Sequence, residues 1–158
     1  MNKISKLSNQ EKAYIGGFLD GDGSINGQIV RRKDYRFNFQ IRIGITFFQK
    51  TSKHWFILWL HKKLQYGKIR KKPDGMSEYT IIGPQNVEKV LEQIKPYLKI
   101  KRKQAILALD IIKNKSKSVD HNSFLKCCQL VDNFAALNDS KKRTITSAVV
   151  RSDPDFFD

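Results

Sequence analysis

Polar side chains that could read nucleic-acid bases alternate with apolar ones between residues 36 and 47. The apolar set is Phe37, Phe39, Ile41, Ile43, Ile45 and Phe47, and between its members stand Arg36, Asn38, Gln40, Arg42 and Thr46. Arg, Gln and Asn offer the paired contacts that guanine and adenine edges accept in the major groove. Strict alternation predicts a half-buried strand. A wet sheet face alternates in the same way, but it usually mixes both charge signs, and this one carries no acid.

A second candidate for chemistry is the string Ile15–Gly23, in which Asp20 and Asp22 stand among glycines. Ser8 and Glu11 have the spacing of a capping box, which predicts a helix that ends at these glycines. The aspartates then fall at the negative end of the helix dipole, an unfavourable place for a carboxylate. Taken by itself, the string also fits an acidic turn that merely ends a helix.

The glycines of the same string need a reason of their own. Gly16 and Gly17 each cost about 1 kcal/mol relative to Ala inside a helix. Small residues let a second helix approach closely, and Gly17 and Gly21 fall four residues apart on one helix face. We therefore expect this face to pack against another helix.

Cysteine and histidine predict no further chemistry. Cys127 and Cys128 are adjacent, so they can neither pair with each other nor provide a zinc-ligand spacing, which favours a reducing compartment. His54, His61 and His121 are scattered, as is typical of surface or packing histidines.

The rest of the chain predicts the elements that position these residues. Alternation, capping signals and turn residues give an αββαββα order followed by helices. The helix after residue 50 is expected to carry Trp55, Phe56, Trp59, Leu60 and Leu64 on its apolar side. The expected elements are a helix from Ser8 to Gly21, strands over 24–32 and 37–47 joined by a turn at 32–34, a helix capped by Thr51 or Ser52 and ending near 66–67, strands over 68–70 and 79–82 around Pro73–Gly75, and helices over 83–94, 102–114 and 122–137, with a loosely packed polar extension beyond Asn138.

Length and charge set the class of protein. The 158 residues suffice for one domain with its own core, and we expect a single domain over 1–158, with a core of about 8–137 and a basic loop and tail over 138–158. The net charge of +15 predicts a polyanionic partner. Residues 23–77 hold 13 Lys and Arg against Asp34 and Asp74, so the polyanion site should lie there. No run of about 18 apolar residues predicts a membrane span.

The glycine- and aspartate-rich string resembles the signature of the LAGLIDADG homing endonucleases, with Gly16 where the signature has Ala. The element order is similar to that family's fold, an α+β domain with a saddle-like antiparallel sheet for DNA. The resemblance extends to about Arg151 and is closest to the single-motif members that act as homodimers. It implies that the motif helices of two subunits meet, through Gly16, Gly17, Leu19, Asp20 and Gly21.

The resemblance also implies the catalytic residues. Asp22 matches the acid that binds the catalytic Mg²⁺, with the Gly21 carbonyl as a second ligand, whereas Asp20 matches an acid with a more structural role. Gln49 and Lys53 match active-site residues that organise water around the scissile phosphate. Lys101 matches an active-site lysine; for each lysine, a solvated surface charge is the common alternative.

Contacts to double-stranded DNA are expected on the polar sheet face and in one loop. A strand from Arg36 to Phe47 spans about 40 Å, enough to read a half-site of about one duplex turn. The candidate base readers are Asn26, Gln28, Arg32, Tyr35, Asn38, Gln40, Arg42, Thr46, Lys68, Arg70, Lys72, Glu78 and Thr80. The segment with Ser140, Lys141, Lys142 and Arg143 resembles a family loop that grips phosphates, or is a mobile basic tail.

These features together predict a homodimeric, Mg²⁺-dependent endonuclease that cuts both strands of a long, partly palindromic DNA site. Two other classes stay open: an RNA-binding intron splicing cofactor (maturase), and a DNA-binding regulator without enzymatic activity. The amino terminus lacks the features of a secretory signal or a transit peptide. We therefore expect a protein made where it works, and the family implies an organelle interior, chloroplast or mitochondrion.

Overall fold

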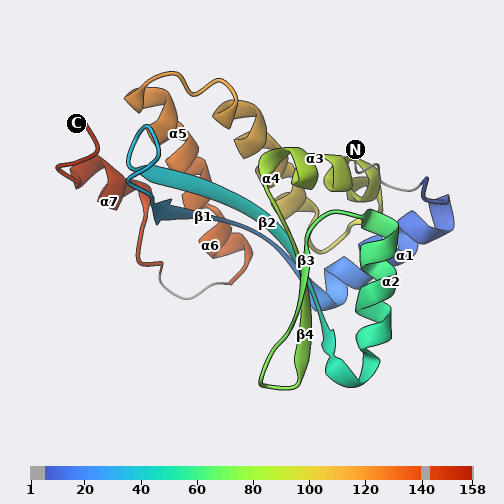
Figure 1. Ribbon diagram of the computed structural model, residues 1–158. Helices are drawn as coiled ribbons and strands as arrows, with labels where there is room; N and C mark the ends of the chain where they lie inside the picture. The colour runs from blue at the N-terminus through green and yellow to red at the C-terminus, as the bar shows by residue number, and fades with distance from the viewer. Residues whose placement is uncertain (1–5, 140–142, 158) are drawn as a thin grey trace.

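The computed structural model describes residues 6–139 and 143–157 (Figure 1). Helices and strands follow the expected αββαββα order, and further helices complete the chain. The elements are α1 (Asn9–Asp22), β1 (Gly23–Arg31), β2 (Phe39–Lys50), a 3₁₀ turn (Thr51–Lys53), α2 (His54–Leu64), β3 (Lys68–Lys71), β4 (Met76–Ile82), α3 (Pro84–Ile94), a 3₁₀ turn (Lys95–Tyr97), α4 (Arg102–Lys115), α5 (His121–Asp132), α6 (Phe134–Leu137) and α7 (Ser147–Ser152). The predicted α+β class is confirmed.

Helix α1 begins and ends as its sequence predicts. The Ser8 side chain accepts a hydrogen bond from the Glu11 N–H, and the Glu11 carboxylate accepts one from the Ser8 N–H, both at 3.1 Å. At the other end the Gly23 N–H donates to the Leu19 carbonyl. Since β1 starts at Gly23, the two aspartates stand where the helix passes into the sheet.

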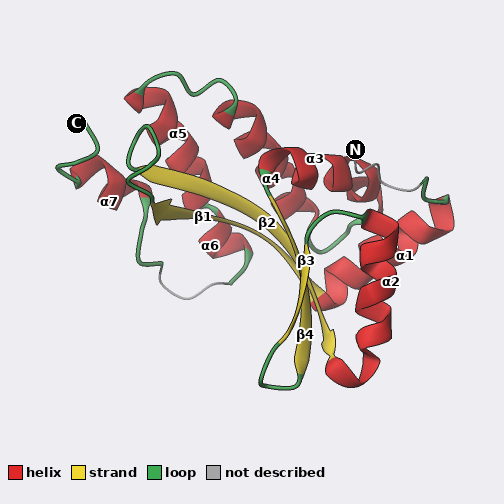
Figure 2. Ribbon diagram, viewed as in Figure 1, coloured by secondary structure: helices red, strands yellow, loops and turns green. Residues whose placement is uncertain are grey.

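The strands of the described chain form an antiparallel sheet in the order β1-β2-β4-β3. Gly23 pairs with Phe47 and Arg31 with Phe39, so β1 runs along β2 for its full length. β4 pairs only with the second half of β2, from Gly44 onward. In Figure 2 the sheet is a strongly curved band with α1 to α5 along its outer side.

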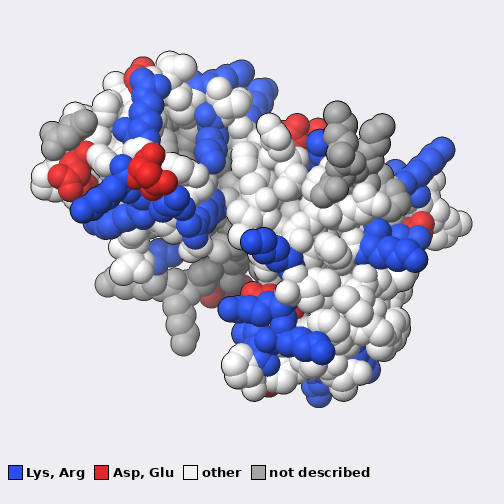
Figure 3. Space-filling view, in the orientation of Figure 1, with Lys and Arg blue, Asp and Glu red and all other residues white. Residues whose placement is uncertain are grey.

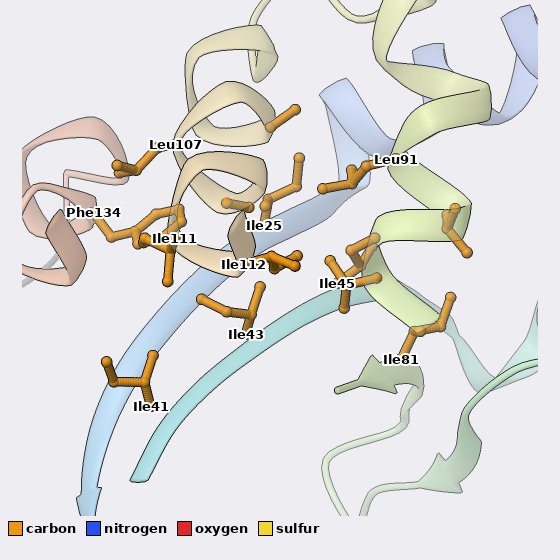
Figure 4. Packing of buried hydrophobic residues seen from close by; sticks show 14 of the residues in the cluster. Ile25, Ile41, Ile43, Ile45, Ile81, Leu91, Leu107, Ile111, Ile112 and Phe134 are labelled. Carbon is orange, nitrogen blue, oxygen red and sulfur yellow. The ribbon is translucent and has the colours of Figure 1, made fainter. Parts of the chain in front are cut away.

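The core lies between this helical layer and the inward face of the sheet. Ile25 of β1 and Ile43 and Ile45 of β2 are at most 2% exposed, and they meet side chains from α3 and α4 (Figure 4). Every second residue of β2 from Phe39 to Phe47 is buried. The alternation therefore places the intervening polar residues on the opposite, helix-free face.

The connection between β1 and β2 is longer than the predicted turn at 32–34. It runs from residue 32 to residue 38, because β2 begins at Phe39. The Arg32 N–H donates to the Asn38 carbonyl, and Asn38 adopts a left-handed backbone with φ of 63°. The Asn38 side chain donates to the Asp155 carbonyl at 2.7 Å, so a partner far along the chain holds the loop.

The start of α2 also differs from expectation. Neither Thr51 nor Ser52 caps it; both lie in the preceding 3₁₀ turn, and no described side chain caps the helix. The Thr51 hydroxyl instead accepts from the Ser77 hydroxyl at 3.2 Å, which ties the turn to β4. Trp55, expected on the apolar side, is 67% exposed.

The expected loosely packed extension is wrong. The predicted helix over 122–137 is split at Asn133 into α5 and α6, and α7 packs against α5. Ser147 hydrogen-bonds to the Asp132 carboxylate through its N–H and its hydroxyl. Val150 and Phe156 are completely buried, so the core continues beyond residue 137.

Candidate nucleic-acid interface and active site

Asp20 fastens the end of α1 to the segment that precedes α4. Its carboxylate accepts hydrogen bonds from the backbone N–H groups of Lys99, Ile100 and Lys101 at 2.8, 3.2 and 3.0 Å. Burial on its own would raise the pKa of Asp20, but these hydrogen bonds hold it below its usual value. This geometry agrees with the structural role expected of Asp20.

Lys101 is held beside the same helix end. Its Nζ donates to the Asp20 carbonyl at 2.5 Å. A cation close to the last carbonyls of a helix is favoured by the helix dipole, so Lys101 offsets part of the cost of the aspartates. The lysine is therefore positioned near the motif and is not an isolated surface charge.

Asp22 and Gly21 are exposed, unlike Asp20. Within residues 6–139 and 143–157, no group of three or more His, Cys, Asp or Glu could hold a metal ion. One chain therefore presents Asp22 without further clustered carboxylates. Oxygen donors of this kind suit Mg²⁺, which is often held by one or two carboxylates and by phosphate oxygens.

Gln49 and Lys53 lie near the end of β2. Gly23 is paired with Phe47, so Gln49 follows two residues beyond the point where α1 meets the sheet. The Gln49 Oε1 accepts from the Lys50 N–H at 2.8 Å, which fixes its side chain. Lys53 is exposed in the 3₁₀ turn that follows.

Only part of the expected dimer face is exposed on α1. An added Cβ at Gly17 or Gly21 would meet no described atom within 4 Å, so these glycines leave an open surface. Gly16 is different, because its Cβ would lie 3.0 Å from the Tyr97 Cβ. Leu19 is completely buried. The expectation that Gly16 and Leu19 contact a second chain is wrong: Gly16 serves close packing within this chain, and Leu19 belongs to its core.

Most of the expected base readers share the open face of the sheet. They follow the outward alternation of each strand, opposite the buried residues. These residues are Asn26 and Gln28 of β1, Gln40, Arg42 and Thr46 of β2, Glu78 and Thr80 of β4, and Lys68 and Arg70 of β3. A shallow hollow of about 170 Å³ lies at the centre of this face.

Hydrogen bonds join the expected readers near the β1–β2 loop into one network. The Arg42 Nε donates to the Gln40 Oε1 at 3.2 Å, and the Gln40 Nε2 donates to the Tyr35 hydroxyl at 3.0 Å. The Arg32 guanidinium lies 5.0 Å from the Tyr35 ring centroid and binds both carboxylate oxygens of Asp34. Hydrogen bonding to Arg32 lowers the pKa of Asp34. The network orders long side chains before any ligand is bound.

Ion pairs also hold basic side chains of the β3–β4 hairpin. Arg70 pairs with Glu78 at 3.0 Å, and Lys72 pairs with Asp74 at 3.3 Å. Figure 3 shows Lys and Arg side chains gathered over this hairpin and over the β1–β2 end of the sheet. The two basic regions flank the open face.

Two of the expected DNA contacts have structural partners within the chain. The side-chain amide of Asn38 holds the C-terminal segment, as described above, and does not belong to a strand. Arg143 is only partly exposed, and its guanidinium donates to the Gly27 carbonyl and to the Asn26 Oδ1. Burial lowers the pKa of Arg143. Arg143 therefore fastens the C-terminal segment to the edge of β1; Ser140, Lys141 and Lys142 lie outside the described residues.

Three residues of the open face are not among the expected base readers. Ser24, Gly44 and Ile82 lie on the open face and line its central hollow. Their alternation with Ile25, Ile43 and Ile81 was a usable signal, but Gly44 and Ile82 carry no polar group to mark them as readers. None of the helices in the described parts of the chain has the length and apolarity needed to cross a membrane.

Comparisons with known proteins agree with this geometry. The DNA endonuclease I-CvuI of Chlorella vulgaris is 42% identical over 139 residues, which are 88% of this chain and 86% of the relative. The DNA endonuclease I-CreI of Chlamydomonas reinhardtii is 38% identical over 149 residues, 94% of this chain and 91% of the relative. A crystal structure of I-CvuI with its DNA target and Ca superposes with a TM-score of 0.86 and covers 90% of both chains.

A more distant structure shares the fold. The archaeal intron-encoded endonuclease I-Vdi141I, crystallised with DNA, has a TM-score of 0.79 at 16% identity and covers 91% of this chain. The family model described as LAGLIDADG endonuclease matches residues 15–131, from the motif helix to the end of α5. The chain therefore belongs to the LAGLIDADG endonuclease family.

Proposed function

We propose that two copies of this chain form a site-specific endonuclease that cuts both strands of a long, partly palindromic DNA target. The observation that carries the proposal is the position of Asp22. It is exposed at the end of the motif helix, directly before β1 and on the helix end that Lys101 contacts. A carboxylate and a lysine thus stand where the DNA-facing sheet begins.

The site fits Mg²⁺ when two chains contribute to it. Asp22 and the Gly21 carbonyl are the oxygen donors that one chain offers, and phosphate oxygens and the second chain would complete the set. A bound Mg²⁺ supplies positive charge for the charge that builds on phosphorus and promotes deprotonation of the attacking water. The open surface at Gly17 and Gly21 lets two motif helices approach, which brings the Asp22 carboxylates together.

The other residues of the site bind and orient. Lys101, held by the Asp20 carbonyl, adds a fixed positive charge for the phosphate in the transition state. The Gln49 amide nitrogen stays available to orient water, because its Oε1 is the atom that binds the Lys50 N–H. Lys53 contributes positive charge from an exposed position.

DNA lies along the open face in this proposal. The basic regions at the β1–β2 end and at the β3–β4 hairpin contact phosphates, and side chains between them read base edges in the major groove. Two copies related by a twofold axis read two half-sites, which makes the target partly palindromic. We expect the chain to act as a single domain. The relatives from Chlorella vulgaris and Chlamydomonas reinhardtii support an organelle interior as the place of action.

The proposal is tested by incubating the protein with a randomised duplex library and Mg²⁺, and by sequencing the cut ends. We expect one recurring, partly palindromic site cut in both strands. Asp22→Asn should abolish cleavage while the affinity for that site changes by less than about tenfold, or about 1.4 kcal/mol. The matched control is Asp110→Asn, the same chemical change at an exposed position of α4, which should cut like the wild type.

Each other outcome identifies a different class of protein. Specific, metal-independent binding without cutting by the wild type would make the chain a DNA-binding regulator. Binding to structured intron RNA without DNA cleavage would make it a splicing cofactor. Cleavage by Asp22→Asn at the wild-type rate would remove Asp22 from the metal site.

A further inference from the structure

A row of residues across the open face combines a polar residue, an empty position and an apolar residue. Gly44 of β2 pairs with Asn26 of β1 on one side and with Ile82 of β4 on the other. Because Gly44 has no side chain, the row is hollow at its centre, and this is the hollow of about 170 Å³ described above.

The backbone does not require a glycine at position 44. The glycines with positive φ are Gly67, Gly75 and Gly83 among the described residues, and Gly44 is not one of them. A Cβ at Gly44 would lie 3.4 Å from the Ile81 carbonyl oxygen and 3.9 Å from the Ile82 Cγ1, an ordinary van der Waals contact. Glycine weakens a strand interior and often marks a place where a ligand approaches closely. The empty position therefore points to an occupant of the hollow.

Ile82 provides the apolar wall of this hollow. It is 55% exposed, although its outward neighbours on the same strand, Thr80 and Glu78, are polar. Burial of an exposed isoleucine against an apolar group of a ligand is energetically favourable, because it removes apolar surface from water. In the major groove the apolar group that a base presents is the 5-methyl of thymine.

Asn26 provides the polar wall, and its amide has a fixed orientation. Its Oδ1 accepts from the Arg143 Nη2 at 2.6 Å and from the Asn138 Nδ2 at 3.4 Å. A guanidinium only donates hydrogen bonds, so the oxygen of Asn26 must face Arg143 and the Nδ2 group is the one left for a ligand. A donor suits the O4 acceptor of thymine and repels the N4 donor of cytosine.

We propose that the hollow at Gly44 is a thymine-specific subsite, in which the 5-methyl contacts Ile82 and the O4 faces the Asn26 amide. The inference rests on the proposed function, because it assigns one base preference within the DNA site. Ile82 and Gly44 are then specificity-determining residues, and Arg143 is a positioning residue that acts through Asn26.

Deoxyuridine provides a direct probe, since it keeps the hydrogen bonds of thymidine and lacks only the methyl. Each dT of the target found by library selection is replaced by dU, one position at a time, and binding is measured for the wild type and for Ile82→Ser. We expect one position per half-site at which dU weakens wild-type binding about fourfold. This factor corresponds to the transfer free energy of one buried methyl group. With Ile82→Ser, dT and dU should bind equally at that position.

Two further variants sharpen the test. Gly44→Thr fills the hollow and should remove the preference for thymine at the same position, with unfolding in urea unchanged or shifted to higher urea. The matched control is Val119→Ser, an exposed apolar residue in the α4–α5 connection that is 66% exposed, which should keep the wild-type dU profile.

The inference is overturned if no dU position depends on Ile82, or if Ile82→Ser changes the preference at a position that is not thymine. If the wild-type protein still selects and cuts a target, either of these results leaves the proposed function intact. A protein that binds no duplex overturns both.

Discussion

Asp20 performs a structural task at a position that looks catalytic. Its carboxylate accepts hydrogen bonds from the backbone N–H groups of Lys99, Ile100 and Lys101, and its backbone carbonyl accepts one from the Lys101 side chain. Asp22, two residues later, is exposed. One acid therefore fixes the geometry of the site, which leaves the other free for a ligand.

Replacing Asp20 by Asn tests this task through its pH dependence. The pKa of Asp20 is lowered in the folded chain, so its contribution to stability is complete above the unfolded pKa of about 4 and is lost as pH falls through the folded value. We expect Asp20→Asn to cost about 1–3 kcal/mol at pH 6. The difference from the wild type should shrink towards pH 3.

Urea unfolding at a series of pH values makes the measurement. Asp110→Asn, at an exposed position, should stay within about 0.5 kcal/mol of the wild type throughout. A difference between Asp20→Asn and the wild type that is the same at pH 6 and pH 3 would show that the carboxylate charge has no part in the attachment.

At the scale of elements, the glycines of α1 differ in what they contact. Gly16 brings the helix close to Tyr97, whereas Gly17 and Gly21 leave a surface that no described residue covers. The close contact at Gly16 stabilises the single chain. The open surface is available for a partner, and in our proposal the partner is a second copy.

Gly17→Leu tests the open surface. Since an added side chain at Gly17 meets no described atom within 4 Å, the variant should fold, but its bulk should keep two motif helices apart. We expect a monomer in sedimentation velocity, with cleavage of both strands lost. Lys126→Leu, at an exposed position of α5, should remain dimeric and active. A dimeric, active Gly17→Leu would place the interface elsewhere.

The C-terminal segment is an integral part of the fold. Phe156 is completely buried and its ring lies 6.2 Å from that of Phe37 and 6.0 Å from that of Phe124, measured between centroids. Its neighbour Phe157 is 60% exposed. Adjacent phenylalanines thus provide a matched pair.

Phe156→Ala should lower the free energy of unfolding by about 3–5 kcal/mol, because it empties a filled site in the core. Phe157→Ala should lower it by less than about 1 kcal/mol. Urea unfolding of both variants makes the comparison. Equal, small effects would mean that the segment after α7 contributes little to stability.

Local signals predicted the elements whose determinants are close in sequence. The Ser8–Glu11 capping box and the β2 alternation needed no distant partner, and both are confirmed. The β1–β2 loop could not be predicted in this way, because Asn38 is held by Asp155, 117 residues away. The structural contacts of Arg143 were missed for the same reason: in the sequence, a surface arginine and one that binds the edge of β1 look alike.

At the scale of the whole molecule, the net charge is +15, and three acids lie among the basic side chains of the two flanking regions. Asp34, Asp74 and Glu78 each pair with a basic side chain of the flanking regions. Exposed pairs of this kind contribute little to stability. They do order the arginines and lysines, which in our proposal would then contact phosphates and bases with less loss of side-chain freedom.

The salt dependence of DNA binding separates phosphate contacts from structural cations. Neutralising one phosphate contact reduces the slope of log K against log salt by about 0.9, hence by about 1.8 in a homodimer. We expect this change for Lys142→Gln, with base preferences unaltered. Arg143→Gln should leave the slope close to the wild-type value, because its guanidinium binds Gly27 and Asn26. It should instead lower the free energy of unfolding by about 1–3 kcal/mol.

The expected base readers are a third class of residue, beside phosphate contacts and structural cations, that the same experiment tests. Gln40→Ala and Arg70→Ala should each relax the preference at one symmetric pair of base positions, because a good bidentate contact carries about 1–3 kcal/mol of discrimination. Titrations at several salt concentrations and cleavage of a library of singly substituted sites provide both readouts. Uniform loss of affinity in the Gln40 and Arg70 variants, with preferences unchanged, would reduce the sheet to an electrostatic platform. A slope for Arg143→Gln that falls as far as that of Lys142→Gln, with stability unaltered, would return Arg143 to the phosphate contacts.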